Sequence, residues 1–210
     1  MKLLSCAALS ATIAVLAIAL TLLQPLAAAQ GTSVIYTPAS ATTKATAVLM
    51  PKTIAKPQLE LLDYAYKVAV QDGHKYPQYV QGVMMQESKA GAMLGFRVAG
   101  LGNKIGDRYA GICQIKLVAA KAVLASYPKM WLKLDTKTDE ELFARLILDD
   151  KFNIEICSKY LLMMGVNADP ARGIAAFNQG PGGVQAIENP SDFHYTKGVI
   201  AYSAKTKRPS

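Results

Sequence analysis

Apolar residues recur at helical spacing along most of this chain, in segments separated by glycine and proline, from about residue 57 to residue 204. This spacing places apolar side chains on one face of an α-helix. It predicts about seven helices, near residues 57–73, 77–88, 113–126, from 139 onward, 153–164, 170–177 and 192–204. Residues 90–107 contain five glycines and no helical period, which predicts a long loop or a short hairpin. The predicted fold class is therefore mainly α, with little strand.

The N-terminal end has a different composition. Met1-Lys2 is followed by an uncharged apolar run from Leu3 to Leu26 and then by three alanines at positions 27–29. A short basic start, an apolar stretch and small residues at the end are typical of a cleaved signal peptide, here residues 1–29. An N-terminal membrane anchor is the alternative, because the run is long enough to span a bilayer. We expect export, to the periplasm or out of the cell.

The remaining roughly 180 residues are enough for one domain with its own core. Residues 30–56 are rich in Thr, Ala, Ser and Pro and have no sustained period, which predicts a flexible linker. The folded domain is expected at residues 57–204, and residues 205–210 form a short basic tail.

The net charge indicates an anionic partner. The formal charge of +8 becomes +7 when Lys2 leaves with the signal peptide. Such a charge suits nucleic acid, anionic lipid or an acidic cell-wall polymer. The chain has no lysine- and arginine-rich block with interleaved aromatic residues, and export argues further against nucleic acid. The cell wall is therefore the expected partner.

The cysteines and histidines predict neither a metal site nor a cofactor. Cys6 lies in the signal peptide, so Cys113 and Cys157 remain as a pair that can form a disulfide in an oxidising compartment. Two buried thiols that pack as small apolar residues are the alternative. His74 and His194 are isolated in the sequence, and no His/Cys cluster has the spacing of metal ligands.

Glu87 is the candidate catalytic residue. It falls at i+7 of an apolar stripe that contains Val80, Val83 and Met84, whereas Gln78, Gln81 and Ser88 are expected on the solvent face. An apolar environment destabilises the charged form of a carboxyl group and raises its pKa, as a general acid near neutral pH requires. The alternative is a glutamate that reaches water or pairs with Lys89.

Five short blocks occur in a particular order around Glu87. They are Gln86-Glu87-Ser88, Ala110-Gly111-Ile112-Cys113-Gln114-Ile115, Asn153-Ile154 with Tyr160-Leu161, Ala175-Ala176-Phe177-Asn178-Gln179-Gly180-Pro181-Gly182, and Tyr195 to Tyr202. This series resembles the soluble lytic transglycosylase family, which is related to goose-type lysozyme. The resemblance covers about residues 58–204. It implies a lysozyme-like α+β fold with helices around a glycan-binding cleft.

The resemblance also implies a reaction. Glu87 would be the single acid/base that protonates the oxygen between N-acetylmuramic acid and N-acetylglucosamine in peptidoglycan. The substrate's own N-acetyl group assists, and the muramyl 6-hydroxyl closes a 1,6-anhydro ring. Most glycosidases use two carboxylates instead. Asp107 as a second carboxylate is the hydrolytic, lysozyme-like alternative.

The substrate-binding residues follow from the same blocks. They are Ser88, Gln114, Tyr160, Phe177, Asn178 and Tyr195. Asn178 could instead cap the end of its helix, and Tyr160 could belong to the core. Three departures from the family stand out. Glu87 and Gln114 are 27 positions apart, more than is usual. Phe177 stands where the family commonly has Tyr. Cys113 and Cys157 replace a Met and a Gly, which favours a disulfide between them.

The expected partner is therefore the glycan strand of peptidoglycan, bound by a monomer without a cofactor. A role beside secretion or conjugation machinery is compatible with a small exported domain. Two alternatives remain open from the sequence, a hydrolytic muramidase of the same fold and a non-catalytic peptidoglycan-binding scaffold.

Overall fold

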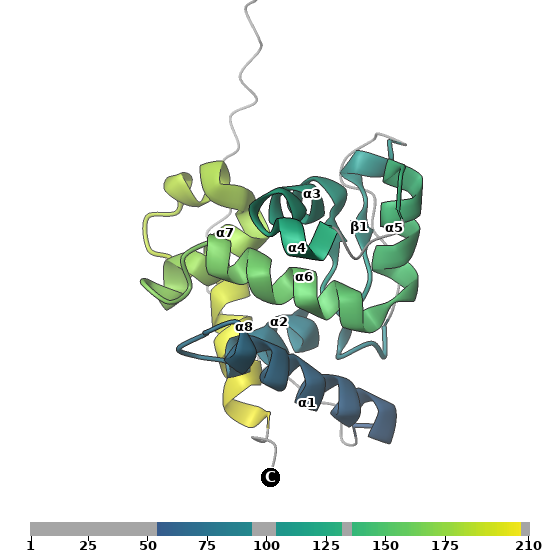
Figure 1. Ribbon diagram of the computed structural model, residues 1–210. Coiled ribbons are helices and arrows are strands. Elements are labelled where there is room, and N and C mark those ends of the chain that lie inside the picture. Colours follow the sequence, from purple (N-terminus) through teal and green to yellow (C-terminus); the bar gives the residue numbers. More distant parts are fainter. Residues whose placement is uncertain (1–53, 94–103, 132–135, 207–210) are drawn as a thin grey trace, which may run out of the picture. The chain divides into compact units, whose positions relative to one another are not determined.

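The computed structural model of the protein describes residues 54–93, 104–131 and 136–206 (Figure 1). All of them belong to one compact unit, Ala45–Ser210. The predicted signal peptide, nearly all of the predicted linker, most of the glycine-rich loop and the end of the basic tail lie outside the described residues.

The described residues are mainly helical, as predicted. Their elements are α1 (Lys56–Gln71), α2 (Gln78–Ser88), the 3₁₀ turn η1 (Ile105–Asp107), β1 (Tyr109–Ala110), β2 (Ile115–Lys116), α3 (Leu117–Ser126), α4 (Pro128–Trp131), α5 (Asp139–Leu148), α6 (Asp150–Met163), α7 (Pro170–Gly183), the 3₁₀ turn η2 (Val184–Ala186) and α8 (His194–Lys205).

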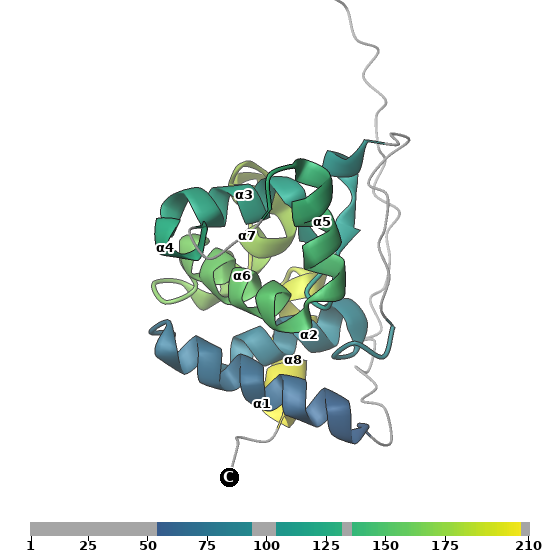
Figure 2. The same ribbon diagram turned by 45° about the vertical axis from the view of Figure 1, so that its right-hand side comes forward.

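Helix α2 lies at the centre of this arrangement. Helices α1, α6 and α8 all pack against it, and Figure 2 shows α2 between α1 and α6. The closest approach is to α8, because Gly82 has no side chain; a Cβ atom there would lie 2.5 Å from the Val199 carbonyl oxygen. A helix with neighbours on several sides buries nearly all of its surface.

This central position corrects one prediction. Gln81 and Ser88 were expected on a solvent face of the helix, but both are buried. Gln81 satisfies its amide by donating a hydrogen bond to the Leu62 carbonyl oxygen over 3.1 Å. The apolar stripe of α2 was correctly predicted, whereas its supposed outer face is covered by other helices.

Side chains that accept backbone N–H bonds begin the later helices. Thr138 and Glu141 form a reciprocal capping box at the start of α5, where the acidic first turn complements the helix dipole. Asp149 accepts from the Phe152 N–H at the start of α6, and Asp169 accepts from the Arg172 N–H at the start of α7. These caps define where α5, α6 and α7 begin.

A short hairpin replaces the first part of the helix predicted at residues 113–126. Strands β1 and β2 pair antiparallel, with Tyr109 opposite Lys116, and α3 begins only at Leu117. Between the strands, Gly111 and Gln114 have positive φ angles of 69° and 50°, which a helix does not allow. The described residues thus contain little strand, as predicted, but the hairpin lies after the glycine-rich stretch 90–107 where a short hairpin was considered.

Helix α7 also differs from its prediction. The sequence predicted that it stops before Gly180, and the structure continues it to Gly183 through a kink at Gly180, where φ is 76°. The break is thus correctly placed, and a further helical turn follows it. Among the helices of the described residues, none is both long and apolar enough to cross a membrane.

Candidate active site

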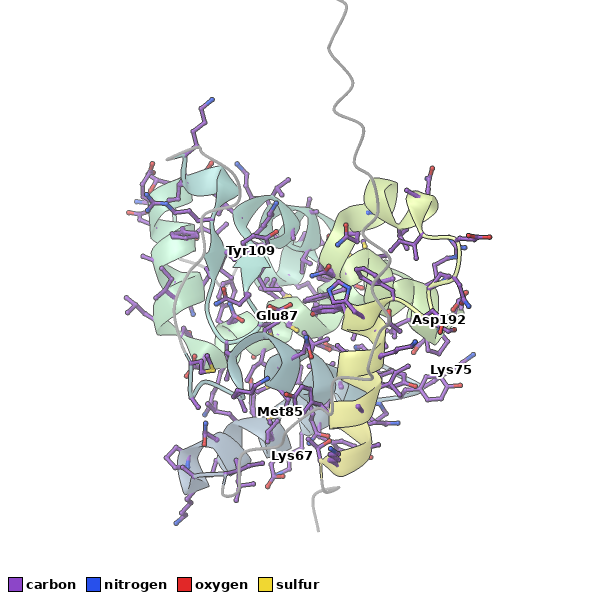
Figure 3. The ribbon with its side chains drawn as sticks, turned by 180° about the vertical axis from the view of Figure 1, so that it is seen from behind. Lys67, Lys75, Met85, Glu87, Tyr109 and Asp192 are labelled. Carbon is purple, nitrogen blue, oxygen red and sulfur yellow. The ribbon has the colours of Figure 1, made fainter. Side chains whose placement is uncertain are left out.

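Glu87 lies half-buried in the last turn of α2 (Figure 3). The hydroxyl of Tyr195 donates a hydrogen bond to Glu87 Oε1 over 2.6 Å. Tyr195 comes from the first turn of α8, so the tight packing of α2 and α8 brings the two side chains together. A short hydrogen bond to a carboxylate fixes the position of that carboxylate.

The Tyr195 hydroxyl keeps its proton. Its pKa is well above the ordinary value for tyrosine, first because the side chain is buried and then because of the charge and the hydrogen bond of Glu87. A phenol that stays protonated remains a donor, so Glu87 Oε1 has a permanent hydrogen-bond partner over the usual pH range.

Two thiols lie close to this carboxylate. Cys113 and Cys157 are buried free cysteines in the structure. Burial raises the pKa of the Cys113 thiol well above its ordinary value, and the hydrogen-bonded Cys157 thiol and the charge of Glu87 act in the same direction. The pair predicted from the sequence is therefore in contact, but it is unbridged in this structure, and the disulfide stays a prediction.

The turn at residues 111–114 is held from two sides. On one side, Ser88 Oγ donates to the Ile112 carbonyl oxygen over 2.7 Å and accepts from the Gly91 N–H over 2.9 Å. The side chain of Ser88 is only 1% exposed. Its hydroxyl is therefore engaged with the backbone, which makes Ser88 a residue that positions the turn, and its contact with substrate stays a prediction.

Asn153 of α6 holds the same turn from the other side. Its amide nitrogen donates to the carbonyl oxygens of Ala110 and Leu146, each over 3.0 Å, and its amide oxygen accepts from the Cys113 N–H over 2.9 Å. All three bonds are buried, where an unpaired polar group is costly. Asn153 belongs to one of the five sequence blocks, and the structure gives it this anchoring role.

Gln114 follows the anchored part of the turn. Its backbone N–H and its side-chain amide both bond to the Gly111 carbonyl oxygen, over 3.1 Å and 2.8 Å. The φ angle of Gln114 is 50°. A positive φ at a residue other than glycine costs free energy and is common at functional sites. The turn thereby carries Gln114 to the wall of a pocket.

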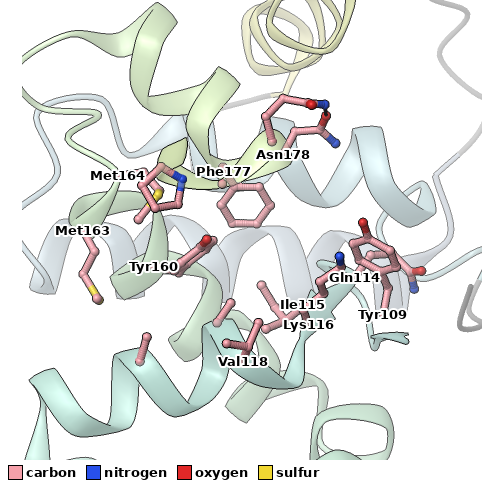
Figure 4. Close-up of a pocket in the computed structure, with 15 residues that line it drawn as sticks. Tyr109, Gln114, Ile115, Lys116, Val118, Tyr160, Met163, Met164, Phe177 and Asn178 are labelled. Atoms are coloured by element: carbon pink, nitrogen blue, oxygen red, sulfur yellow. Dashed lines mark hydrogen bonds between the residues drawn. The ribbon is translucent and has the colours of Figure 1, made fainter. Parts of the chain in front are cut away.

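The pocket has a volume of about 430 Å³ (Figure 4). It lies among the hairpin, α3, the end of α6 and the kinked part of α7. Its lining residues are Tyr109, Gln114, Ile115, Lys116, Val118, Ala119, Ala122, Tyr160, Met163, Met164, Phe177, Asn178, Gln179, Gly180 and Pro181. This volume suits a small organic ligand or part of a polymer.

Four residues predicted from the sequence meet in this pocket. They are Gln114, Tyr160, Phe177 and Asn178. The rings of Tyr160 and Phe177 lie 5.4 Å apart at 58°, so they form one continuous aromatic wall. Tyr160 is partly buried, which raises the pKa of its hydroxyl. It therefore has both of the roles considered for it, packing against the core and lining the pocket.

Asn178 faces the pocket just before the kink at Gly180. Its Oδ1 accepts a hydrogen bond from Gln179 Nε2 over 2.6 Å, and Figure 4 shows Asn178 at the pocket edge. The first segment of α7 ends at the kink two residues further on, at Gly180, and the side chain of Asn178 bonds to Gln179. Helix capping by Asn178 therefore stays an alternative to its contact with substrate.

Glu87 and Tyr195 are not among the residues that line this pocket. Tyr195 is only 4% exposed and contacts Glu87, and its contact with substrate stays a prediction. The connection between Glu87 and the pocket runs through the turn, because Cys113 lies within electrostatic range of Glu87 and the next residue, Gln114, lines the pocket.

Several lining residues carried no signal in the sequence. Tyr109 and Lys116 face each other across the hairpin, with Lys116 Nζ 4.8 Å from the centre of the Tyr109 ring. Met163 and Met164 end α6 and resemble ordinary core residues. Four others could have been found, since they lie inside the blocks that contain Gln114 and Asn178: Ile115, Gln179, Gly180 and Pro181.

Two further features concern chemistry other than that of Glu87. Within the described ranges, no group of three or more His, Cys, Asp or Glu residues could hold a metal ion. The side chain of Asp107, the second carboxylate of the hydrolytic alternative, lies outside what the structure describes.

Compared with known proteins, the chain matches no family model, no curated protein and no solved structure.

Proposed function

We propose that this protein is a peptidoglycan lytic transglycosylase in which Glu87 is the acid and base. One observation carries the proposal: a half-buried carboxylate is held by a buried tyrosine next to a turn whose Gln114 lines a pocket shared with Asn178 and two aromatic rings. A positioned carboxylate, a neighbouring amide and an aromatic wall suit cleavage of a sugar polymer by one acid/base residue.

The proposed reaction follows the family resemblance of the sequence blocks. Glu87 protonates the oxygen that leaves N-acetylmuramic acid, while the N-acetyl group of that sugar stabilises the positive charge. Glu87 then takes a proton from the muramyl 6-hydroxyl, which closes the 1,6-anhydro ring. Tyr195 holds the carboxylate during both proton transfers. The site of action is the cell wall, in the periplasm or outside the cell, and the positive net charge favours this anionic polymer.

The test uses zymography on peptidoglycan with Glu87→Gln and a matched control. The control is Glu155→Gln, because Glu155 Oε1 also accepts a hydrogen bond from a tyrosine, Tyr64, over 2.6 Å but lies outside the five sequence blocks. We expect Glu87→Gln to lose clearing by a factor of about 1,000, within the range of general acid–base catalysis, and Glu155→Gln to keep it.

Other outcomes assign other functions. Equal clearing by wild type and Glu87→Gln would show that Glu87 is not the acid. Binding of peptidoglycan without clearing by the wild type would favour the non-catalytic scaffold. Mass spectrometry of the products separates the transglycosylase from the hydrolytic muramidase, because anhydro ends are lighter than reducing ends by one water.

A further inference from the structure

The pocket has two chemically different sides. Figure 4 shows Met163, Met164 and Tyr160 on one side and Tyr109, Gln114 and Asn178 on the other. The second side carries amides and a hydroxyl that suit a sugar. The first side carries thioethers and an aromatic ring, so the two sides fit different parts of one ligand.

Small side chains of helix α3 leave space on the apolar side of the pocket. Its residues Val118, Ala119 and Ala122 line the pocket, and two of them are small. Val118 is 66% exposed, although it is large and apolar. Sugar hydroxyls that lose water against methyl groups and thioethers would find no hydrogen-bond partner there, which is unfavourable. Alkyl groups lose nothing by the same contact, and methionine adapts to their shape.

The charge of the pocket favours a ligand that carries negative charge. Lys116 lines it, whereas none of its lining residues is Asp or Glu. The ammonium group of Lys116 lies over the Tyr109 ring, which holds it at the edge of the polar side. A ligand that combines alkyl groups with carboxylates is therefore complementary to this pocket.

We propose that the pocket binds the peptide stem of peptidoglycan, with its alkyl side chains against Met163, Met164 and Val118 and a carboxylate facing Lys116. This inference rests on the proposed function and deepens it, because it makes the protein selective for glycan strands that still carry their stems. Among the parts of peptidoglycan, only the stem combines several alkyl side chains with carboxylates.

The first test fills the apolar side. Ala122→Leu adds bulk at an exposed position of α3, and Leu is a good helix former, so the fold is unaffected. Ala125→Leu makes the same change on an exposed position of α3 that does not line the pocket. The substrates are glycan strands with intact stems and strands whose stems have been removed by an amidase.

We expect Ala122→Leu to lower kcat/KM on stem-bearing strands about tenfold, as blocking of an apolar contact does, and to change it less than about twofold on stem-free strands. Ala125→Leu should match the wild type on both. An equal effect of Ala122→Leu on the two substrates, or none on either, overturns the stem assignment and leaves the proposed function standing. Absence of wild-type turnover on both substrates overturns the two together.

The second test addresses the charge. A soluble muramyl peptide is titrated in two forms, with free carboxylates and with the carboxylates amidated, against wild type, Lys116→Gln and the control Lys129→Gln. We expect the wild type and Lys129→Gln to prefer the free form about threefold, the strength of an exposed ion pair, and Lys116→Gln to show no preference. A preference that persists in Lys116→Gln overturns the role of Lys116.

Discussion

Tyr195 and Glu87 are joined by a hydrogen bond of 2.6 Å, although 108 residues separate them in the sequence. The donor is buried and stays protonated, and the acceptor lies half-buried in the last turn of α2. In the proposed reaction this bond holds the acid in one rotamer while it gives and takes a proton.

Removing this hydroxyl tests its role. We expect Tyr195→Phe to lower kcat by about ten- to a hundredfold, the equivalent of a hydrogen bond to a charged group, with a smaller change in KM. Steady-state kinetics on peptidoglycan measures it. Tyr202→Phe is the control on the same helix, because its hydroxyl bonds to Lys89 Nζ over 2.6 Å instead. Equal loss of turnover in both variants would mean that the substitutions disturb α8, and it would contradict a specific role for the Tyr195 hydroxyl.

Gly111 is expected to tolerate no side chain. Its φ is positive, and a Cβ atom there would collide with the Leu146 carbonyl oxygen and with Asn153. We expect Gly111→Ala to lower the free energy of unfolding by about 3 kcal/mol or more, since left-handed strain and overpacking add. Gly165→Ala is matched in φ, at 83°, but has open space, and should lose only about 1 kcal/mol. Urea unfolding compares them, and equal losses would refute the packing argument.

Formation of a disulfide between the two cysteines should depend on whether oxidant is present during folding or only afterwards. Cys113 and Cys157 are in contact but fully buried, and the raised pKa of Cys113 leaves little thiolate. We therefore expect a folded, reduced protein to resist oxidised glutathione, whereas refolding with it should form the bridge and stabilise the fold by about 2–4 kcal/mol. Thiol titration after denaturation, in a Cys6→Ser background, measures this. Free thiols after oxidative refolding would leave the pair as packing residues.

His74 should make the protein less stable in weak acid. Burial lowers the pKa of its imidazole below the ordinary 6.5, and the charge of Lys159 adds to this, although Ser158 and Asp72 oppose it. Between the pKa of His74 in the unfolded chain and its lower pKa in the folded protein, only the unfolded chain binds the proton. The free energy of unfolding is therefore full above about pH 6.5 and falls as the pH decreases. For one proton it falls by at most about 1.4 kcal/mol per pH unit.

The test is urea unfolding of wild type and His74→Gln from pH 7.5 to pH 5. The variant should show a flatter dependence of stability on pH in this range, because glutamine does not titrate. A control is His194→Gln, since His194 is exposed. An unchanged slope in His74→Gln would place the acid sensitivity elsewhere.

The helices were largely predictable because each buries an apolar face with helical spacing. The exception lies at residues 111–116, where Ile112, Cys113 and Ile115 continue an apolar pattern that also fits a helix. The positive φ of Gln114 has no signal in the sequence, because it depends on the bonds that Ser88 and Asn153 make to the turn.

The candidate site was predictable in part. Gln114, Tyr160 and Asn178 belong to the ordered blocks, and the structure brings them to one pocket. The burial of Ser88 was not foreseen, because it depends on helices that cover α2 from both sides. Lys116 was missed for a similar reason: only the pairing of two very short strands places it at the pocket.

Helix α2 contributes Glu87 and is enclosed by α1, α6 and α8. Its backbone N–H groups can meet water only when those helices separate, which amounts to opening the whole core. Exchange of its amide hydrogens should therefore be among the slowest in the molecule and follow global unfolding. In that case the carboxylate keeps its position while less enclosed parts of the fold open.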